Sequence, residues 1–279
     1  MTTTLYLVRH AEAEGNWRRT FQGHSNSDVS EKGYRQLEYL ARRFADIPLD
    51  AVYASPLKRA YETAKAIDRA AGLPIVTDDG LMEINGGAFE GVPFAELPLR
   101  FPVEEARWDN EPWAFEAPGG ESMRSVYERM RDTIGRIVRA HAGGTVAVAS
   151  HGCAIRNYLC FAQGWPIERI GEVGWCDNTA VSRIEFGDDF LPRPVYLNDS
   201  SHLPEAASTF ALQDWWRSVP VTEEDRAAYA ARERAKEQGD PAPMDLKLRH
   251  TMAVLGNARR IAASEGFGVA LTRACLLAA

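Results

Sequence analysis

Two histidines and two arginines of this sequence follow short apolar runs, where they could bind and attack a phosphate group. Arg9 and His10 follow the run LYLV, and His151 follows the run VAVA and one serine. Arg59 lies five residues beyond a third run, AVYA. A neutral imidazole is a nucleophile, and a guanidinium offers paired donors to phosphate oxygens. These residue types therefore indicate phosphoryl chemistry.

The elements that position these side chains are predicted to be parallel strands. Residues 5–8, 51–54 and 145–149 are almost entirely apolar, which is typical of strands buried on both faces. Open α/β sheets bind ligands at the carboxyl ends of their strands, so three such junctions can place the four side chains around one point. At the second junction, Ser55 is expected to cap a helix whose first residue is Pro56. A histidine considered alone is more often a buried or solvated side chain without chemistry, but the grouping weakens that interpretation.

Six separated segments resemble, in order and spacing, the motifs of the histidine phosphatase superfamily, whose members have the phosphoglycerate-mutase-like fold. The segments are LYLVRHAEAEGN, RTFQGHSNSDVSEKG, SPLKRAYETA, LMEINGGAFEG, SHGCAIRNYL and DNTAVSRIEF. Together they span about residues 1–205. One departure is Ala11, which stands where the family most often has glycine and would be strained if φ there were positive.

The resemblance implies a phosphomonoesterase that works through a phosphohistidine intermediate on His10. It assigns the proton for the leaving group to Glu83, and Glu90 is a weaker candidate for the same role. The other catalytic positions would surround the phosphoryl oxygens: Arg9, Arg59 and His151. Substrate-binding donors are expected in the loop after the nucleophile: Asn16, Gln22 and Gly23. This chemistry requires neither a metal nor a cofactor, because arginine and histidine supply the charge.

A proline- and aromatic-rich segment, residues 89–118, interrupts the alternation of strands and helices. Its aromatic side chains favour an uncharged or bulky leaving group over a small, highly anionic acid, and ordinary core packing explains them about as well. Two alternatives to a phosphatase acting on a small phosphorylated metabolite stay open. One is a phosphoglycerate mutase, which returns the phosphoryl group to its substrate. The other is a non-catalytic interaction protein on the same scaffold.

The alternation of elements predicts an α/β fold. We expect a mainly parallel central sheet flanked by helices on both faces, plus a C-terminal helical extension. Besides the strands above, the pattern predicts short strands at 75–76 and 179–186. It also predicts a helix capped by Ser30 and helices over 56–71, 121–141 and 153–162.

The sequence changes character after about residue 205. Residues 1–205 are predicted to form the histidine phosphatase domain, and 206–243 a charged helical linker. Residues 244–279 resemble the first two helices of an HD-type metal-dependent phosphohydrolase domain, with His250 at the position of its first metal ligand. The family's His-Asp pair would follow Ala279, so a truncated HD-type domain without a metal is one of two interpretations that the sequence favours about equally. A helical hairpin that packs on the phosphatase domain is the alternative.

The composition narrows the range of partners and compartments. The chain has 279 residues and a net charge of −7, which argues against nucleic-acid or anionic-membrane partners. Four scattered cysteines without metal-ligand spacing indicate free thiols in a reducing compartment. Without a signal peptide or a bilayer-spanning stretch, a cytoplasmic protein is expected. The apolar stripe of the short tail favours a homodimer.

Overall fold

The computed structural model describes residues 1–211, whose strands form one six-stranded sheet in the order β3-β2-β4-β1-β5-β6. The strands are β1 (Thr3–Arg9), β2 (Ala51–Ala54), β3 (Ile75–Thr77), β4 (Thr145–Ser150), β5 (Val181–Phe186) and β6 (Pro192–Asp199). Neighbouring strands from β3 to β1 are parallel, and β5 and β6 are antiparallel. The predicted mainly parallel sheet is confirmed.

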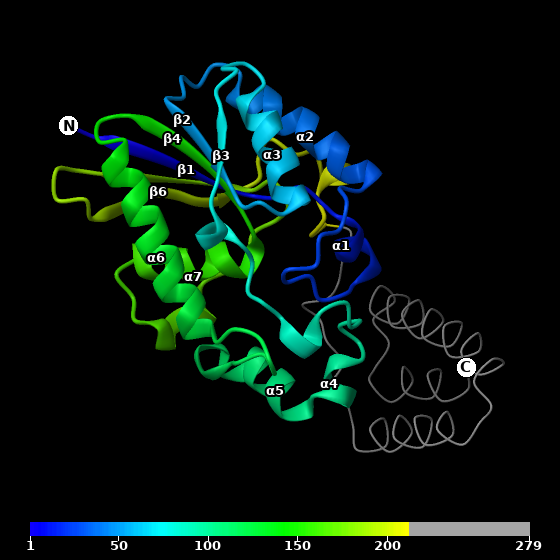
Figure 1. Ribbon diagram of the computed structural model, residues 1–279. Coiled ribbons are helices and arrows are strands. Elements are labelled where there is room, and N and C mark those ends of the chain that lie inside the picture. The colour runs from blue at the N-terminus through cyan, green and yellow to red at the C-terminus, as the bar shows by residue number, and fades with distance from the viewer. Residues whose placement is uncertain (212–279) are drawn as a thin grey trace, which may run out of the picture. The chain divides into compact units, whose positions relative to one another are not determined.

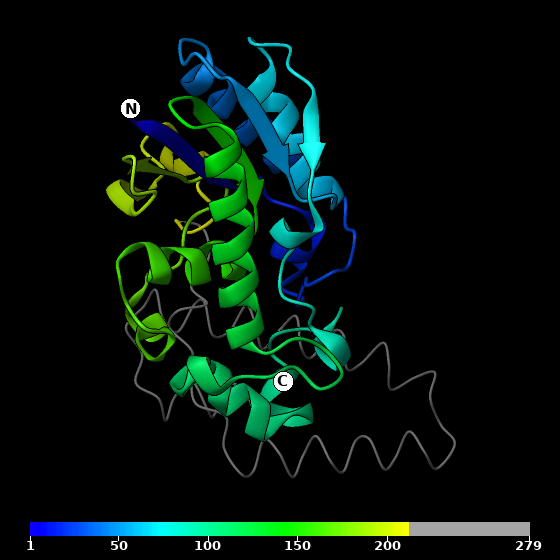
Figure 2. The same ribbon diagram turned by 60° about the vertical axis from the view of Figure 1, so that its left-hand side comes forward.

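Helices cover both faces of this sheet, as predicted. Figures 1 and 2 show the pair α2 (Glu31–Phe44) and α3 (Lys58–Asp68) on one face and the pair α6 (Met123–Ala140) and α7 (Gly152–Ala162) on the other. The shorter helices are α1 (Glu14–Arg18), α4 (Leu97–Arg100) and α5 (Pro102–Asn110). Five 3₁₀ segments complete the described part: Asp79–Leu81, Gly87–Phe89, Pro112–Ala114, Ile167–Glu172 and Glu205–Ala207.

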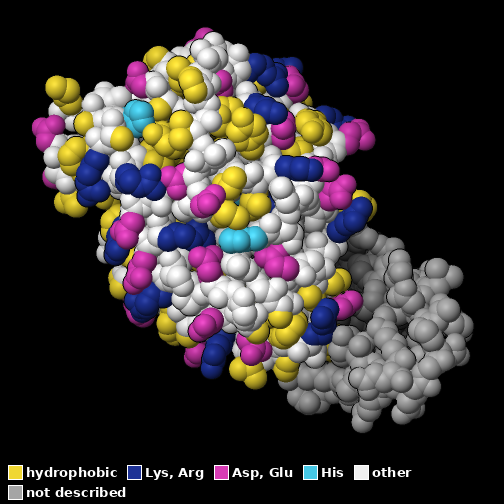
Figure 3. Space-filling model, viewed as in Figure 1, with side chains coloured by type: hydrophobic (Ala, Val, Ile, Leu, Met, Phe, Trp, Pro, Cys, Tyr) yellow, Lys and Arg dark blue, Asp and Glu magenta, His cyan; other side chains and the backbone are white. Residues whose placement is uncertain are grey.

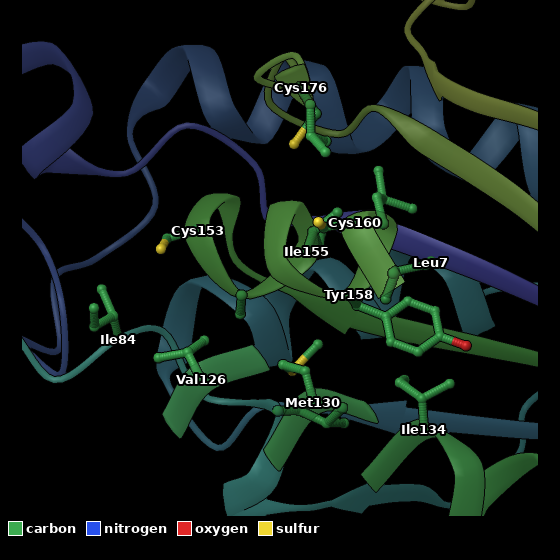
Figure 4. Packing of buried hydrophobic residues seen from close by; sticks show 14 of the residues in the cluster. Leu7, Ile84, Val126, Met130, Ile134, Cys153, Ile155, Tyr158, Cys160 and Cys176 are labelled. Carbon is green, nitrogen blue, oxygen red and sulfur yellow. The ribbon is translucent and has the colours of Figure 1, made fainter. Parts of the chain in front are cut away.

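The apolar run of β1 supplies both layers of the core. Because successive side chains of a strand point to opposite faces, Leu5 and Leu7 pack in the cluster under α6 and α7, while Tyr6 and Val8 pack in the cluster under α2 and α3. Figure 4 shows Leu7 among the side chains of the first cluster, close to Tyr158 of α7. A strand buried in this way holds the residue that follows it in a fixed place.

The start of α3 corrects one prediction. Ser30 caps α2 as expected, since its hydroxyl oxygen accepts the N–H of Gly33 at 3.0 Å. Ser55 does not cap α3, which begins at Lys58 with Leu57 in the capping position. The turn through Pro56 delays the helix by two residues and leaves the Ser55 hydroxyl able to bind a side chain elsewhere.

Strand β6 was not predicted, because Pro192 and Pro194 lack the N–H groups of an ordinary strand. A proline is tolerated at the edge of a sheet, where one side of the strand has no neighbour. The β5–β6 register is accordingly irregular between Val181 and Ile184.

Predictions on the linker after residue 211 and on the C-terminal hairpin, including His250, lie outside the described residues. Within residues 1–211, no helix combines the length and apolar character needed to cross a bilayer. Figure 3 shows basic and acidic side chains interspersed over one face of this part of the chain.

Candidate active site

The sheet brings the two predicted histidines together. Strands β1 and β4 pair in parallel with Arg9 opposite Ser150, and the N–H of His10 donates to the Ser150 carbonyl at 2.9 Å. His10 and His151 therefore leave neighbouring strands at the same end. Their ring centroids are 5.1 Å apart at an interplanar angle of 55°. Sequence reasoning predicted this juxtaposition.

The surroundings of His10 keep its ring neutral and orient it. Nδ1 lies 2.7 Å from the Ala11 carbonyl, which can only accept, so Nδ1 carries the proton and Nε2 keeps its lone pair. Burial lowers the pKa of His10 well below 6.5, and the charges of Arg59 and Arg9 lower it further. Ala11 is not among the residues with positive φ, so it fits without strain where the family most often has glycine. His10 thus presents a neutral nucleophilic nitrogen.

His151 is held by a residue that the sequence did not identify as part of the site. Its Nε2 lies 2.8 Å from the Ser55 hydroxyl, at the carboxyl end of the adjacent strand β2. Burial and then the charge of Arg59 lower the pKa of His151 well below 6.5. The only signal in the sequence was the position of Ser55 at a third strand end, and it was interpreted as a helix cap.

Both arginines lie where predicted, but most of their terminal nitrogens bind backbone carbonyls. Arg59 is fully buried and donates from Nη1 to Ser25 O at 2.6 Å and from Nη2 to Gly23 O at 2.8 Å and Gln22 O at 3.2 Å. Burial lowers the pKa of Arg59 to about 10, against the opposing charges of carboxylates nearby. Arg9 donates from Nη1 to the Cys176 carbonyl at 2.5 Å.

Three buried nitrogens of this group have no hydrogen-bond partner within residues 1–211: Arg9 Nε, Arg59 Nε and His151 Nδ1. Both arginine Nε groups are donors. A buried polar group without a partner costs about 1–3 kcal/mol, so proteins seldom keep several together without use. An oxyanion beside His10 would satisfy donors of this kind. The residues therefore suit a phosphoryl group.

Glu83 lies at the amino end of α7, the helix whose capping residue is His151. Its Oε1 accepts the N–H groups of Ile84 at 3.0 Å and Ala154 at 2.9 Å, and its Oε2 accepts that of Cys153 at 3.0 Å. A helix N-terminus favours an acidic side chain in this position. Each carboxyl oxygen can accept two hydrogen bonds. Oε1 already accepts two and Oε2 only one, so the free position on Oε2 is where Glu83 can carry a proton.

The loop after the nucleophile is held by Glu90. The carboxylate accepts the N–H groups of His24 at 2.7 Å, Gly86 at 2.9 Å and Ser25 at 3.0 Å, and also the Ser25 hydroxyl. Burial raises the pKa of Glu90, but these hydrogen bonds outweigh it and bring the pKa below its ordinary value. Both Glu90 oxygens accept two hydrogen bonds each, so Glu90 is suited to fixing the loop and, unlike Glu83, has no acceptor site left for a proton.

The three predicted substrate-binding residues occupy this loop and α1. The carbonyls of Gln22 and Gly23 accept from Arg59, and the Gln22 side chain accepts from the Ser27 hydroxyl. Gly23 is required for close approach, because a Cβ there would collide with the Ile84 carbonyl and with Glu90. Asn16 Oδ1 accepts the N–H of Ala13 at 2.9 Å.

Comparisons with known proteins agree with this geometry. The family model of the histidine phosphatase superfamily (branch 1) matches residues 5–200. The chain belongs to the histidine phosphatase superfamily. Phosphoserine phosphatase 1 of Hydrogenobacter thermophilus is 37% identical over 201 residues, covering 72% of this chain and 94% of that protein.

Two further relatives span most of the same region. Probable phosphoglycerate mutase GpmB of Yersinia pestis is 33% identical over 186 residues, which cover 65% of this chain and 84% of that protein. The solved structure of Bacillus stearothermophilus YhfR has a TM-score of 0.69 and 30% identity, covering 72% of this chain and 98% of that one. Both agree with the α/β fold.

An aromatic group lies near Arg9 in this member of the superfamily. Trp108 stacks on Trp175 with ring centroids 5.9 Å apart and meets Phe115 edge-on at 4.8 Å. A Cβ at Gly152 would lie 3.3 Å from Arg9 Nε and 3.6 Å from the Trp175 ring. Trp175 is therefore close to Arg9, and Trp108 of the 89–118 segment packs on it. We call Trp108 and Trp175 the wall.

Proposed function

We propose that the chain is a phosphomonoesterase that transfers the phosphoryl group of a small phosphorylated metabolite to His10 and then to water. The observation that carries this proposal is the neutral His10 ring, whose centroid is 5.1 Å from that of His151, among buried nitrogens that have no partner within residues 1–211. Membership of the histidine phosphatase superfamily supports it.

The first step would be an in-line attack by His10 Nε2 on phosphorus. As the Nε2–P bond forms, the bond from phosphorus to the leaving oxygen breaks, and Glu83 in its protonated form delivers its proton from Oε2 to that oxygen. Arg9, Arg59 and His151 would stabilise the charge that spreads over the three other oxygens, which is the main catalytic task in phosphoryl transfer.

In the second step, water would attack the phosphohistidine. The new O–P bond replaces the Nε2–P bond, and Glu83 accepts the proton that the water loses. The products are phosphate and neutral His10, with Glu83 again protonated. This cycle divides one difficult displacement into two easier ones.

The names of two relatives suggest which substrates to test first. One relative is named a phosphoserine phosphatase and another a probable phosphoglycerate mutase, so phosphoserine and 3-phosphoglycerate are the first compounds to test. The wall that contains Trp108 and Trp175 favours a leaving group with an apolar or planar surface over one that is small and highly charged.

The test is phosphate release by the full-length protein from a panel of small phosphomonoesters. His10→Ala is the blank, and His141→Ala is the matched control. His141 precedes β4, at the amino end of that strand and away from His10, and its ring is hydrogen-bonded to the Tyr53 hydroxyl. We expect the blank to lose turnover and acid-labile phosphoprotein, and the control to keep both. Full turnover by the His10→Ala protein would refute the covalent mechanism. Exchange of phosphoglycerates without phosphate release would establish the mutase instead, and absence of both activities would favour a non-catalytic role.

A further inference from the structure

The last described segment, residues 207–211, binds both stretches of chain that flank the nucleophile. We call these five residues the strap. They begin at the last residue of the 3₁₀ segment Glu205–Ala207, and the mechanism proposed above gives them no part.

On one side, the strap binds Asp177, which is 5% exposed. Asp177 Oδ1 accepts the N–H groups of Thr209 at 3.1 Å and Phe210 at 3.3 Å, and Oδ2 accepts the Ser208 hydroxyl at 2.5 Å. The carboxylate also accepts the N–H of Asn178 at 2.8 Å. The strap therefore fixes the start of the loop that runs from Asp177 to β5.

That loop in turn holds the backbone of the nucleophile. Asn178 Nδ2 donates to the His10 carbonyl at 2.9 Å, and the Thr179 N–H donates to the Arg9 carbonyl at 3.1 Å. Thr179 has a φ of +59°, a conformation that a β-branched residue adopts only where its surroundings enforce it. The contacts of Asp177 and Asn178 are such an enforcing environment.

On the other side, the strap binds Glu12 and Gln36. Thr209 is 2% exposed, and its hydroxyl donates to Glu12 Oε2 at 3.2 Å. Gln36 donates from Nε2 to the Ala207 carbonyl at 2.8 Å and to the Thr209 hydroxyl at 3.0 Å, while its Oε1 accepts the N–H of Glu12 at 2.8 Å. The chain two residues after His10 is thereby fixed to the same strap.

We propose that Thr209 and Asp177 are positioning residues for His10, because the strap joins the two stretches of backbone on either side of the nucleophile into one rigid unit. This inference rests on the proposed function, in which His10 Nε2 must meet phosphorus in line. Catalytic groups must be held within about 0.5 Å of their productive geometry, and a misplacement of about 1 Å costs roughly 100-fold in rate. Neither residue touches the phosphoryl site, so their effect acts through the backbone.

The test compares hydroxyl removal at the strap with the same change at the far end of β1. Thr209→Val keeps the shape and removes the hydroxyl, and Thr209→Ser keeps the hydroxyl. Thr3→Val is the matched control, since Thr3 is also 2% exposed and its hydroxyl accepts the N–H of Gly143 at 2.9 Å. Asp177→Asn is a second strap variant, which places amide hydrogens against the N–H donors of the strap.

In the full-length protein, we expect Thr209→Val and Asp177→Asn to lower kcat by about tenfold, part of the 100-fold cost of a full misplacement, with KM changed by less than about twofold. Thr209→Ser should restore kcat to within about twofold of the parent. Thr3→Val should lower the thermal midpoint as much as Thr209→Val does but leave kcat unchanged. If the two valine variants lose stability equally and both keep kcat, the strap is only structural and the inference is wrong.

A second measurement does not depend on turnover. In the histidine ring spectrum of the protein, with the His10 signal assigned from His10→Ala, Thr209→Val should shift the His10 resonances and Thr3→Val should not. Shifted resonances in a protein that releases no phosphate would uphold the positioning contact and reject the proposed function. Unshifted resonances in an active Thr209→Val protein would reject the positioning contact alone.

Discussion

Replacing Glu83 by glutamine removes the proton donor while keeping the size of the side chain and two of its three hydrogen bonds. The amide oxygen of the introduced side chain could still accept the N–H groups of Ile84 and Ala154, which now donate to Oε1. The amide nitrogen would occupy the place of Oε2, opposite the Cys153 N–H at 3.0 Å. Two donors would then face each other, and the variant would have no proton to give.

Glu83→Gln should lose both stability and catalytic rate, and the two effects can be told apart. One buried N–H without an acceptor costs about 1–3 kcal/mol of unfolding free energy. General acid catalysis contributes roughly 100- to 10,000-fold in rate, but only where the leaving oxygen needs a proton. We therefore expect kcat/KM of Glu83→Gln to fall by about 100-fold or more for an alkyl phosphate and far less for p-nitrophenyl phosphate, whose phenolate leaves unprotonated.

The assay measures kcat/KM on the two esters for the parent and the variant, together with urea unfolding of both proteins. The ratio of the two rate losses is independent of how much protein is folded, since both esters report on the same sample. If Glu83→Gln loses the same factor on both esters, Glu83 only supports the fold of α7 and is not the proton donor. If it loses nothing on either, the carboxyl group has no part in the reaction.

Three further outcomes follow from the same contacts. Ser55→Ala should lower kcat by about 5- to 160-fold, the equivalent of about 1–3 kcal/mol for leaving His151 Nε2 without its 2.8 Å partner. Unchanged kinetics would show that Ser55 does not orient that ring. Because His10 and His151 have pKa values well below the ordinary 6.5, the unfolded chain binds protons that the folded chain does not. Urea titrations should therefore show unfolding free energy falling as pH drops below about 6.5, by about 1.4 kcal/mol per pH unit for each ring that stays neutral, whereas equal stability at pH 7.5 and 5 would contradict neutral burial. Trp175→Ala should lower kcat/KM for a phenyl phosphate more than for a methyl phosphate, by about fivefold for a lost aromatic contact, and equal losses would place the wall outside the leaving-group site.

The placement of the nucleophile was predictable because it depends on rules that act along one strand. The apolar run of β1 must be buried on both faces, and the residue after a parallel strand must lie at the ligand-binding edge of the sheet. The same rule applied to β4 puts His151 next to His10 without any knowledge of their distance. The sheet, its helices and the fold class follow from this reasoning together with the resemblance.

The partner that each side chain binds was not predictable in the same way. Ser55 reaches His151 across 96 residues, and Glu90 reaches Ser25 across 65. Such pairs depend on which loops the finished fold brings together, and neither residue stands in a pattern that identifies its partner. A serine before proline at a strand end fits a helix cap as well as a ligand for histidine, and only the position of the neighbouring strand decides between them.

The positions of the two arginines were predictable from the strands, but their hydrogen-bond partners in the loops were not. Each guanidinium has five N–H donors, and the sequence predicted only that Arg9 and Arg59 would surround the phosphoryl oxygens. Arg59 gives three hydrogen bonds to the loop carbonyls of Gln22, Gly23 and Ser25, and its buried Nε has no partner in the described part of the chain. The loop carbonyls fix the guanidinium plane before any phosphate arrives, so the charge is oriented at no further entropic cost when the substrate binds. An Arg59→Lys variant would keep the charge and lose this fork, and it should therefore bind phosphate and turn over poorly, whereas near-normal kcat would mean that charge alone suffices.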